Sequence, residues 1–359
     1  MLANASSASP GSVASSTRRV RGDLRAARRI LAAALDRDRP LMAHMVVTRR
    51  CNLSCGYCTE YDKVSPPVPL ASLKERVDHL ARLGTVFVTL TGGETLLHPD
   101  IVELVRYVRS VGMLPALNTN GYLLTRERIV ELGKAGLFAM QISVDNVTPN
   151  EVSKKSLKPL RPKLLLLAAH ATFRVRVNTV LGAAPPEECL EVARFVTGLG
   201  LEAKCSFARD PQGRLLPVDD RGRAVYEQIC EMSRRGTSVL SEDFQIALLR
   251  DGEVEWKCRA GARFFTICED GLVHLCTPKM GLGAKPLAEY STQDIRTAFE
   301  TPKPCAATCP VAYAHQGSSL DVWRSQPLPP SLPPPSAVVS SWQAATQRAL
   351  GRVHLAVVQ

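Results

Sequence analysis

Apolar runs of strand length alternate with segments of helical periodicity between Leu41 and Phe207. An apolar stripe over 101–108 predicts one helix, and Glu187–Leu199, followed by Gly200, predicts another. Six strand–helix units in succession predict an α/β fold with a parallel sheet. The pattern is compatible with a partly closed barrel and with an open doubly wound sheet, and both place chemistry at the C-terminal ends of the strands. The predicted strands are Leu41–Thr48, Val86–Leu90, Leu114–Leu117, Phe138–Ser143, Phe173–Leu181 and Leu201–Phe207.

The segments that flank this array differ from it in composition. Met1–Ser16 is rich in Ala, Ser and Gly, and we expect it to be disordered. Thr17–Arg39 holds eight Arg and three Asp, a net charge of +5, and its apolar residues recur at helical spacing, which predicts a basic amphipathic helix. Three interpretations of its polar face remain: a solvated surface, a docking surface for an acidic redox partner, or part of a transit peptide.

The whole chain divides into five predicted regions. They are a disordered segment and basic helix over 1–39, a core over 40–215, a helical connector over 216–257, a small Cys-rich β/α extension over 258–325, and a Pro-rich linker with a short helix over 326–359.

Composition limits the kind of protein this is. Of 359 residues, 45% are hydrophobic and 22% are charged, which is enough to bury a sizeable core. No apolar run reaches the roughly 18 residues that a membrane span needs, so we expect none. Aromatic residues make up only 5%, and much of the net charge of +11 lies near the N-terminus, so nucleic-acid binding is not expected. Eleven cysteines without an apolar signal segment indicate a reducing cytoplasmic setting, where clustered cysteines bind metal.

A loop after the first predicted strand carries Cys51, Cys55 and Cys58 within eight residues. Iron–sulfur clusters are held by Cys thiolates, usually four. Three close thiolates therefore predict a four-iron cluster with one iron left open, and an open metal position is what a catalytic site needs. The alternative is a zinc site completed by His98.

This loop, followed by Thr91-Gly92-Gly93-Glu94 at the end of the second strand, resembles the radical S-adenosylmethionine (radical SAM) superfamily. The resemblance covers the whole strand–helix array and implies a partial (β/α)6 barrel with a [4Fe–4S] cluster on the three cysteines. It also implies that S-adenosylmethionine chelates the open iron. One electron then cleaves this cofactor to methionine and a 5′-deoxyadenosyl radical, which abstracts a substrate hydrogen. Thr95 stands where the family usually has proline.

Within this resemblance, seven residues are expected to contact the cofactor or face its cavity. The two glycines let backbone approach a ligand closely, and the glutamate accepts from an ammonium group. Ordinary structural roles are the alternatives: a strand-ending turn, an Asn-Gly turn, or an acidic cap on the next segment. The seven are Tyr57, which is expected to pack on the adenine, Gly92, Gly93, Glu94, Asn120, Ser143 and Asp145.

A second set of cysteines lies near the C-terminus. Cys258, Gly271 and Cys276 follow the spacing C-x12-G-x4-C, and Cys305 and Cys309 come later. This is similar to the SPASM and twitch extensions of radical enzymes, which carry auxiliary clusters. The resemblance implies one further [4Fe–4S] cluster on the four cysteines.

Other assignments of this region remain open. Structural zinc on the same four cysteines is the alternative to iron–sulfur, and Cys268 or His315 is a possible replacement ligand. A turn at Glu269-Asp270-Gly271 before Leu272–Leu275 predicts a hairpin that brings the second cysteine of the set beside the first.

These features predict a radical SAM enzyme with a flavodoxin- or ferredoxin-like reductant and an unidentified substrate. We expect oxidation or rearrangement of a small molecule in cofactor or secondary metabolism, because only 40 residues precede the first strand, too few for a peptide-binding domain. Peptide modification with a separate carrier protein is the alternative. A fully ligated auxiliary cluster is expected to accept the electron of a substrate radical. A non-enzymatic iron–sulfur electron carrier is the alternative from another class, and it leaves the Gly-Gly-Glu turn unexplained.

Overall fold

The structure is a computed structural model that describes residues 10–58, 61–210, 213–233, 239–280 and 284–321. Its helices are α1 (Pro10–Leu35), α2 (Leu70–Arg82), α3 (Ile101–Ser110), α4 (Arg126–Ala135), α5 (Leu157–His170), α6 (Pro186–Gly198), α7 (Asp220–Ser233), α8 (Val239–Asp251), α9 (Thr292–Glu300) and α10 (Ala312–Ser319). Its strands are β1 (Met42–Thr48), β2 (Phe87–Gly92), β3 (Leu114–Thr119), β4 (Ala139–Ser143), β5 (Arg174–Leu181), β6 (Glu202–Phe207), β7 (Phe264–Ile267), β8 (Leu272–His274) and β9 (Lys285–Pro286).

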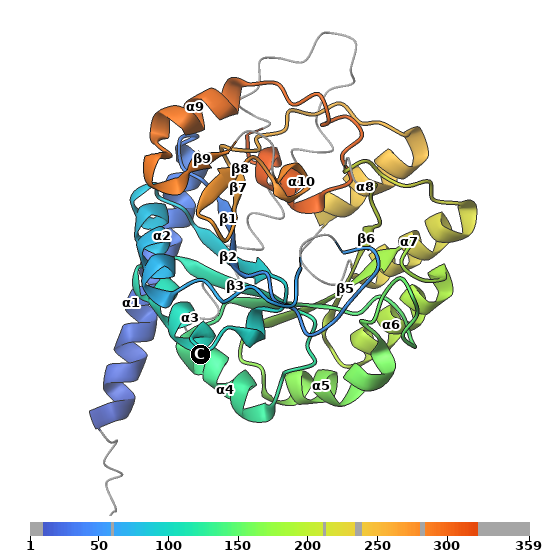
Figure 1. Ribbon diagram of the computed structural model, residues 1–359, viewed down its shortest axis with the longest axis horizontal. Helices are drawn as coiled ribbons and strands as arrows, with labels where there is room; N and C mark the ends of the chain where they lie inside the picture. The colour runs from blue at the N-terminus through green and yellow to red at the C-terminus, as the bar shows by residue number, and fades with distance from the viewer. Residues whose placement is uncertain (1–9, 59–60, 211–212, 234–238, 281–283, 322–359) are drawn as a thin grey trace, which may run out of the picture.

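The nine strands form one sheet in the order β6-β5-β4-β3-β2-β1-β7-β8-β9. Strands β1 to β6 are parallel to their neighbours, and β7 adds to the free side of β1, also in parallel. Strands β8 and β9 follow as antiparallel additions. Figure 1 shows the sheet curving, with helices α2 to α6 along its outer side. The predicted α/β class and partial barrel are thereby confirmed.

Alternation along the strands separates a packed outer face from a polar inner face. Met140, Ile142, Val175 and Val177 are buried in the main hydrophobic core, on the side that the helices cover. Residues between them point to the opposite face, because successive side chains of a strand alternate. The inner face of the curved sheet is therefore free to carry polar groups.

The helices begin and end where local chemistry predicts. The Thr125 hydroxyl accepts a hydrogen bond from the Arg128 N–H at the start of α4, and Gly136 ends that helix in a left-handed conformation at φ 89°. Gly200, placed after the helix from sequence, also has a positive φ of 74°. These caps fix the lengths of the connections that lead back to the strands.

The N-terminal helix differs from its prediction. Disorder was expected up to Ser16, but α1 already begins at Pro10. The small residues that follow contain no interior proline, and proline is well tolerated at the first helical position. The helix ends at Leu35, four residues earlier than expected.

In the C-terminal half, β7 and β8 form the predicted hairpin, β9 is a strand that the sequence pattern did not indicate, and the predicted connector is divided into α7 and α8. The Pro-rich linker and the C-terminal helix predicted over 326–359 lie outside the described residues. No helix in the described part of the chain is both long enough and apolar enough to cross a membrane.

Candidate functional site

The loop that follows β1 is held in place by its own backbone and by one lysine. The Cys51 N–H donates to the Asp62 carbonyl at 3.0 Å. The Lys63 ammonium donates to the carbonyls of Cys51 at 2.9 Å and Leu53 at 2.6 Å. The loop therefore presents its side chains at the C-terminal end of β1, where the strand pattern predicted the chemistry.

Two of the three cysteine sulfurs in this loop accept backbone hydrogen bonds. The Leu53 N–H lies 3.4 Å from Cys51 Sγ, and the Lys154 N–H lies 3.3 Å from Cys55 Sγ. Burial raises the pKa of Cys51, and the Leu53 N–H opposes that rise. None of the eleven cysteines forms a disulfide. A reduced three-Cys loop whose sulfurs already receive N–H donors has the donor chemistry that an iron–sulfur cluster needs.

Gly92 and Gly93 lie against the backbone that leads into this loop. The Gly93 N–H donates to the Thr48 carbonyl at 2.8 Å, and the Glu94 N–H donates to the Arg50 carbonyl at 2.9 Å. A Cβ on Gly92 would lie 2.0 Å from the Thr48 oxygen, and one on Gly93 would lie 2.3 Å from the oxygen of Arg49. Both positions therefore require glycine because β2 continues alongside the start of the Cys loop.

Glu94 is fully buried and holds the ends of two strands together. Its Oε1 accepts from the Thr119 hydroxyl at 2.6 Å and the Leu96 N–H at 2.9 Å, and its Oε2 accepts from the Asn120 N–H at 2.7 Å. Burial raises the pKa of Glu94, and these three donors oppose that rise. The carboxylate thus links the ends of β2 and β3 and leaves acceptor capacity on Oε2.

Asn120 and Asp145 approach the Cys loop from the ends of two further strands. The Asn120 side-chain amide donates to Asn52 Oδ1 at 2.7 Å and lies 3.9 Å from Cys51 Sγ. Asp145 Oδ2 accepts from the Tyr57 hydroxyl at 2.8 Å, while its Oδ1 is buried with no hydrogen-bond partner in the described structure. The structure thus brings Tyr57, Asn120 and Asp145 to one edge of the sheet.

Two further residues of this edge, Ser153 and Lys155, were not identified from the sequence. The Lys155 ammonium donates to the Tyr57 hydroxyl at 2.6 Å and lies 3.9 Å from Asp145 Oδ2. The Ser153 hydroxyl donates to Asp145 Oδ2 at 2.7 Å and lies 4.0 Å from Cys55 Sγ. Burial lowers the pKa of Lys155, but the charges of Tyr57 and Asp145 outweigh this effect and raise it. The one feature of the sequence that could have indicated these two residues is the long connection after β4, which lies at the C-terminal ends of the strands, where the site was predicted.

Ser143 ends β4 at the border of a polar inner face. In register across the sheet, Asn118 lies beside Gln141, Gln141 beside Arg176, and Arg176 beside Glu202. The Arg176 guanidinium lies 3.2 Å from the Glu202 carboxylate. The inner face thus offers amide, cationic and anionic groups below the Cys loop.

His98 does not join the Cys loop. Its Nε2 lies 2.8 Å from the Val68 carbonyl, and its Nδ1 accepts from the Asp100 N–H at 3.1 Å. Both ring nitrogens are engaged by backbone, so the zinc site completed by His98 does not match this geometry.

The four C-terminal cysteines lie close enough for their charges to act on one another. Burial, followed by the charges of Cys258, Cys309 and Cys305, raises the pKa of Cys276 to about 12. In the described residues, no three of these sulfurs lie within 4.8 Å of one another. A tetrahedral zinc with Zn–S bonds near 2.3 Å would need sulfur separations of about 3.8 Å. The described sulfurs are therefore not set at the separations of a preformed tetrahedral zinc site.

The remaining candidate ligands lie elsewhere. His315 stacks on Phe244 with ring centroids 3.8 Å apart and contacts the edge of Trp256. Cys268 lies in the β7–β8 hairpin, near Asp270 and His274. The other three cysteines, Cys189, Cys205 and Cys230, are buried in the main hydrophobic core.

A pocket of about 330 Å³ opens beside Cys51. Its lining includes Arg50, Asn52 and Lys63, so two cationic side chains border the opening. The pocket gives a small anionic or polar group access to the loop from outside the sheet.

Comparison with known proteins agrees with this geometry. Residues 45–200 match the family model described as the Radical SAM superfamily. The AdoMet-dependent heme synthase of Methanosarcina barkeri is 29% identical over 197 residues, which cover 53% of this chain and 56% of the relative. The GTP 3′,8-cyclase of Aquifex aeolicus is 33% identical over 178 residues, which cover 46% and 55%. The PqqA peptide cyclase of Bradyrhizobium diazoefficiens is 39% identical over 111 residues, which cover 30% and 29%.

The chain therefore spans about half the length of these curated relatives, or less. Among solved structures, Streptococcus suis SuiB bound to precursor peptide SuiA is 14% identical, with a TM-score of 0.58, covering 80% of this chain and 74% of that one. This likeness shows a shared fold. Over residues 45–200 the chain is similar in sequence to the Radical SAM superfamily.

Proposed function

We propose that this protein is a radical SAM enzyme that holds a [4Fe–4S] cluster on Cys51, Cys55 and Cys58. The observation that carries the proposal is the loop itself, with three reduced cysteines beside the Gly-Gly-Glu turn and N–H donors on two of their sulfurs. When bound, the cluster and S-adenosylmethionine supply a one-electron cleavage that generates a 5′-deoxyadenosyl radical for hydrogen abstraction.

The protein's own residues bind and orient the cofactor in this proposal. Glu94 retains acceptor capacity on Oε2 and can receive an ammonium group. The orphaned Asp145 Oδ1 is a second acceptor at the same edge. Gly92 and Gly93 keep the turn close to the Cys loop, and Ser143 supplies a hydroxyl at the end of β4.

Tyr57 and Asn120 complete the set of residues proposed to contact S-adenosylmethionine. Hydrogen bonds within the protein fix the position of both side chains. The Tyr57 hydroxyl is engaged by Asp145 and Lys155, and the Lys155 ammonium lies over the ring 4.8 Å from its centroid, so stacking on the adenine would use the opposite face. The amide of Asn120 is fixed by Asn52, beside the ligand Cys51.

The inner face of the sheet supports a polar substrate. The row formed by Gln141, Arg176 and Glu202 offers donors, acceptors and both signs of charge. We therefore propose a small polar molecule of cofactor or secondary metabolism. A peptide is the second candidate, favoured by the similarity to PqqA peptide cyclases and by the fold shared with peptide-bound SuiB.

The C-terminal extension, 258–325, is proposed to hold a second [4Fe–4S] cluster on Cys258, Cys276, Cys305 and Cys309. Its support is the gathering of four cysteines whose charges act on one another. Four protein ligands leave no iron open, so this cluster would accept an electron from a substrate radical and make the reaction an oxidation.

Cleavage of S-adenosylmethionine tests the proposed activity. Protein reconstituted with iron and sulfide without oxygen, then given S-adenosylmethionine and dithionite, should release 5′-deoxyadenosine. Cys55→Ala should abolish the release, while Cys230→Ala, which changes a buried cysteine of α7, should retain it. Iron–sulfur protein that releases none would instead support an electron carrier.

Iron analysis tests the second cluster separately. Wild-type protein should hold about eight irons, and a Cys258→Ala/Cys276→Ala variant about four, because a complete cluster takes four Cys ligands. A zinc ion bound by the sulfurs of these four cysteines would exclude the proposed oxidation.

The reductant is proposed to be a cytoplasmic flavodoxin- or ferredoxin-like protein. Helix α1 offers exposed cationic residues such as Arg28 to an acidic partner. Removal of the whole helix would not test this, because α1 also packs on the fold. Arg28→Glu should slow reduction by flavodoxin and leave reduction by dithionite unchanged; equal rates with flavodoxin would exclude docking at this residue.

A further inference from the structure

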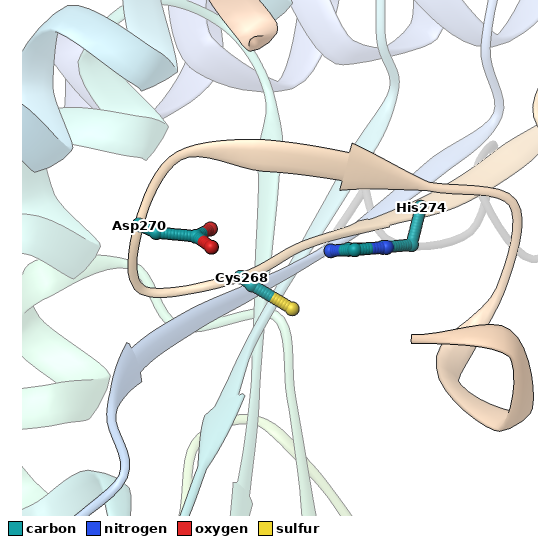
Figure 2. A group of neighbouring side chains, drawn as sticks. All are labelled: Cys268, Asp270 and His274. Atoms are coloured by element: carbon teal, nitrogen blue, oxygen red, sulfur yellow. The ribbon is translucent and has the colours of Figure 1, made fainter. Parts of the chain in front are cut away.

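The β7–β8 hairpin gathers three side chains that are not used by either cysteine set. Cys268 follows β7, Asp270 lies in the turn, and His274 ends β8. One ligand atom from each lies within 4.8 Å of the other two. Figure 2 shows the Cys268 sulfur and the His274 ring on the same side of the hairpin, with the Asp270 carboxylate directed toward them.

Hairpin geometry fixes this arrangement. His274 is paired with Thr266 across the two strands, and the Cys268 N–H donates to the Leu272 carbonyl at 3.0 Å. Gly271 takes the positive φ of 84° that the turn needs. Because alternate residues share a face, Cys268 and His274 both lie on the face of Thr266, opposite Phe265 and Ile267 of the main core. The donors are thus held by the backbone rather than by flexible loops.

Burial and charge at this place suit a divalent cation. Cys268 is 6% exposed and His274 is 4% exposed, whereas Asp270 is open to solvent. Two arginines lie nearby: Arg49 pairs with Glu269 at 3.4 Å, and Arg76 donates to the carbonyls of Cys268 and Glu269. Glu269 offsets one arginine charge, and the Cys268 thiolate and Asp270 carboxylate supply two negative charges beside Arg76 and the cation.

The donor types select the ion. Thiolate, imidazole and carboxylate are the three groups that bind Zn²⁺ in proteins, and Zn²⁺ takes four ligands at tetrahedral positions. The thiol of Cys268 lies 3.4 Å from the Met280 thioether, and this contact would be given up as Zn²⁺ displaces the thiol proton. Three protein ligands leave the fourth position for water or for a donor atom of a substrate.

We propose that Cys268, Asp270 and His274 form a Zn²⁺ site with one open coordination position. This site is distinct from the two cysteine sets, which the same protein reserves for iron and sulfide. It does not depend on cleavage of S-adenosylmethionine, so its test stands apart from that of the proposed activity.

Zinc content and zinc coordination test the proposal on full-length protein. The protein is first reconstituted with iron and sulfide without oxygen, so that the seven cluster cysteines are filled, and then equilibrated with Zn²⁺ and desalted. We expect about one zinc per chain by mass spectrometry. X-ray absorption at the zinc edge should show one sulfur near 2.3 Å and nitrogen or oxygen ligands near 2.0–2.2 Å.

Three variants assign the ligands. Cys268→Ser, His274→Gln and Asp270→Asn should each raise the dissociation constant for Zn²⁺ at least about tenfold, with iron content unchanged. Asp270→Asn is the most conservative, because an asparagine oxygen can still accept from the Leu272 N–H as the aspartate does. Cys230→Ser and His170→Gln, which alter the same residue types on α7 and α5, are the matched controls and should retain zinc.

Three results would overturn the proposal. The first is a zinc content of the wild-type protein no higher than that of the three ligand variants. The second is a zinc shell of sulfur alone, which would place the metal on the four C-terminal cysteines. The third is Zn²⁺ affinity unchanged in both His274→Gln and Asp270→Asn.

Discussion

Gly93 shows how a single residue fixes the position of the Cys loop. A Cβ at Gly93 would lie 2.3 Å from the Arg49 oxygen and 2.4 Å from the Arg50 oxygen, and both are backbone atoms that cannot rotate away. Its φ is not positive, so the requirement for glycine comes from close approach alone. The hydrogen bond from its N–H to Thr48 then ties β2 to the end of β1.

Replacing this glycine should therefore damage the loop more than the fold. We expect Gly93→Ala to lower stability by about 1–3 kcal/mol through overpacking and to lose iron from the Cys51 loop. Urea unfolding and iron analysis measure the two effects. Gly198→Ala is the matched control, because a Cβ there meets nothing within 4 Å at the end of α6, and it should be neutral or slightly stabilising. Equal iron content in both variants would contradict the role given to Gly93.

A hydrogen bond to a ligand sulfur should be visible in a reduction potential. The Lys154 N–H lies 3.3 Å from Cys55 Sγ, and hydrogen bonds to cluster sulfurs are one determinant of potential. Loss of about 1 kcal/mol of differential stabilisation corresponds to roughly 40 mV for a one-electron couple. We expect Lys154→Pro, which removes the N–H, to lower the potential by this order in an electron-paramagnetic-resonance titration. Lys154→Ala keeps the N–H and should leave the potential near that of the wild type.

His315 should make the protein sensitive to acid. Burial lowers the pKa of His315 from 6.5 to about 4, and its Nδ1 has no partner in the described structure. Below pH 6.5, His315 binds a proton in the unfolded chain but stays neutral in the folded protein. The free energy of unfolding therefore decreases as the pH falls from 6.5 to about 4. A shift of this size corresponds to about 3 kcal/mol at most.

The change that tests this is His315→Phe, which keeps the stacking surface toward Phe244 and removes the titrating group. The urea midpoint of metal-free protein should fall less between pH 7 and pH 4 in this variant than in the wild type. His170→Gln should keep the wild-type pH dependence. Identical profiles for wild type and His315→Phe would exclude the proposed effect.

At the scale of elements, α1 stabilises the helices on which it packs. Arg29 donates to the carbonyls of Ala81 at 3.2 Å and Thr85 at 3.3 Å, after α2, and to that of Val111 at 3.1 Å, after α3. These carbonyls lie at helix C-termini, where the backbone lacks partners of its own and cations are favourable. The Arg29 side chain thus caps the C-terminal ends of both α2 and α3.

Arg29→Ala should consequently destabilise the protein by roughly 2–3 kcal/mol, because charged hydrogen bonds to partly buried carbonyls are lost. Amide hydrogen exchange should rise in the last turns of α2 and α3. Arg28→Ala, one residue earlier on an exposed position of the same helix, should change stability by less than about 0.5 kcal/mol. Similar losses in both variants would point to helix propensity rather than to capping.

The elements differ in how far the sequence could predict them. Strands β1 to β6 follow their predicted bounds within about two residues, because each is an apolar run between clear breaks. The β7–β8 hairpin was predicted, but the pairing of β7 with β1 was not, because β1 lies about 220 residues earlier and a local sequence pattern does not indicate distant pairing. The site follows the same division: the Cys loop and the Gly-Gly-Glu turn are local signals. Ser153 and Lys155 reach the loop only through the tertiary fold.

At the scale of the whole molecule, Arg263 joins the two ends of the described chain. It is fully buried, and its five N–H donors are all used: two on the carboxylate of Asp321, one on the carbonyl of Ala33, and one each on those of Asp36 and Arg39. The end of α1, the start of β7 and the segment after α10 therefore meet at one guanidinium. Removing one partner of a buried salt bridge strongly lowers stability, because the other charge remains buried without a counter-charge.

Asp321→Asn should lower stability by about 3–5 kcal/mol, since it leaves the buried Arg263 without its counter-charge. Glu300→Gln is the matched control: it breaks the exposed pair with Arg37 at 2.9 Å and should change stability by less than about 1 kcal/mol. Both can be read from urea midpoints under one set of conditions. If the two variants were equally stable, the buried contact would not anchor the fold.

The pairing of β7 with β1 also bears on how the chain is made. Strand β1 leaves the ribosome well before its second neighbour, which is translated about 220 residues later. At synthesis rates of roughly 5–20 residues per second, that delay lasts on the order of 10–40 s. During it, the nascent strand next to the cysteine loop has an uncovered hydrogen-bonding edge, the kind of surface that associates with other chains. The expected consequence is chaperone occupancy that begins once β1 has emerged and ends when residue 267 has emerged, because β1 waits for a partner from much later in the chain.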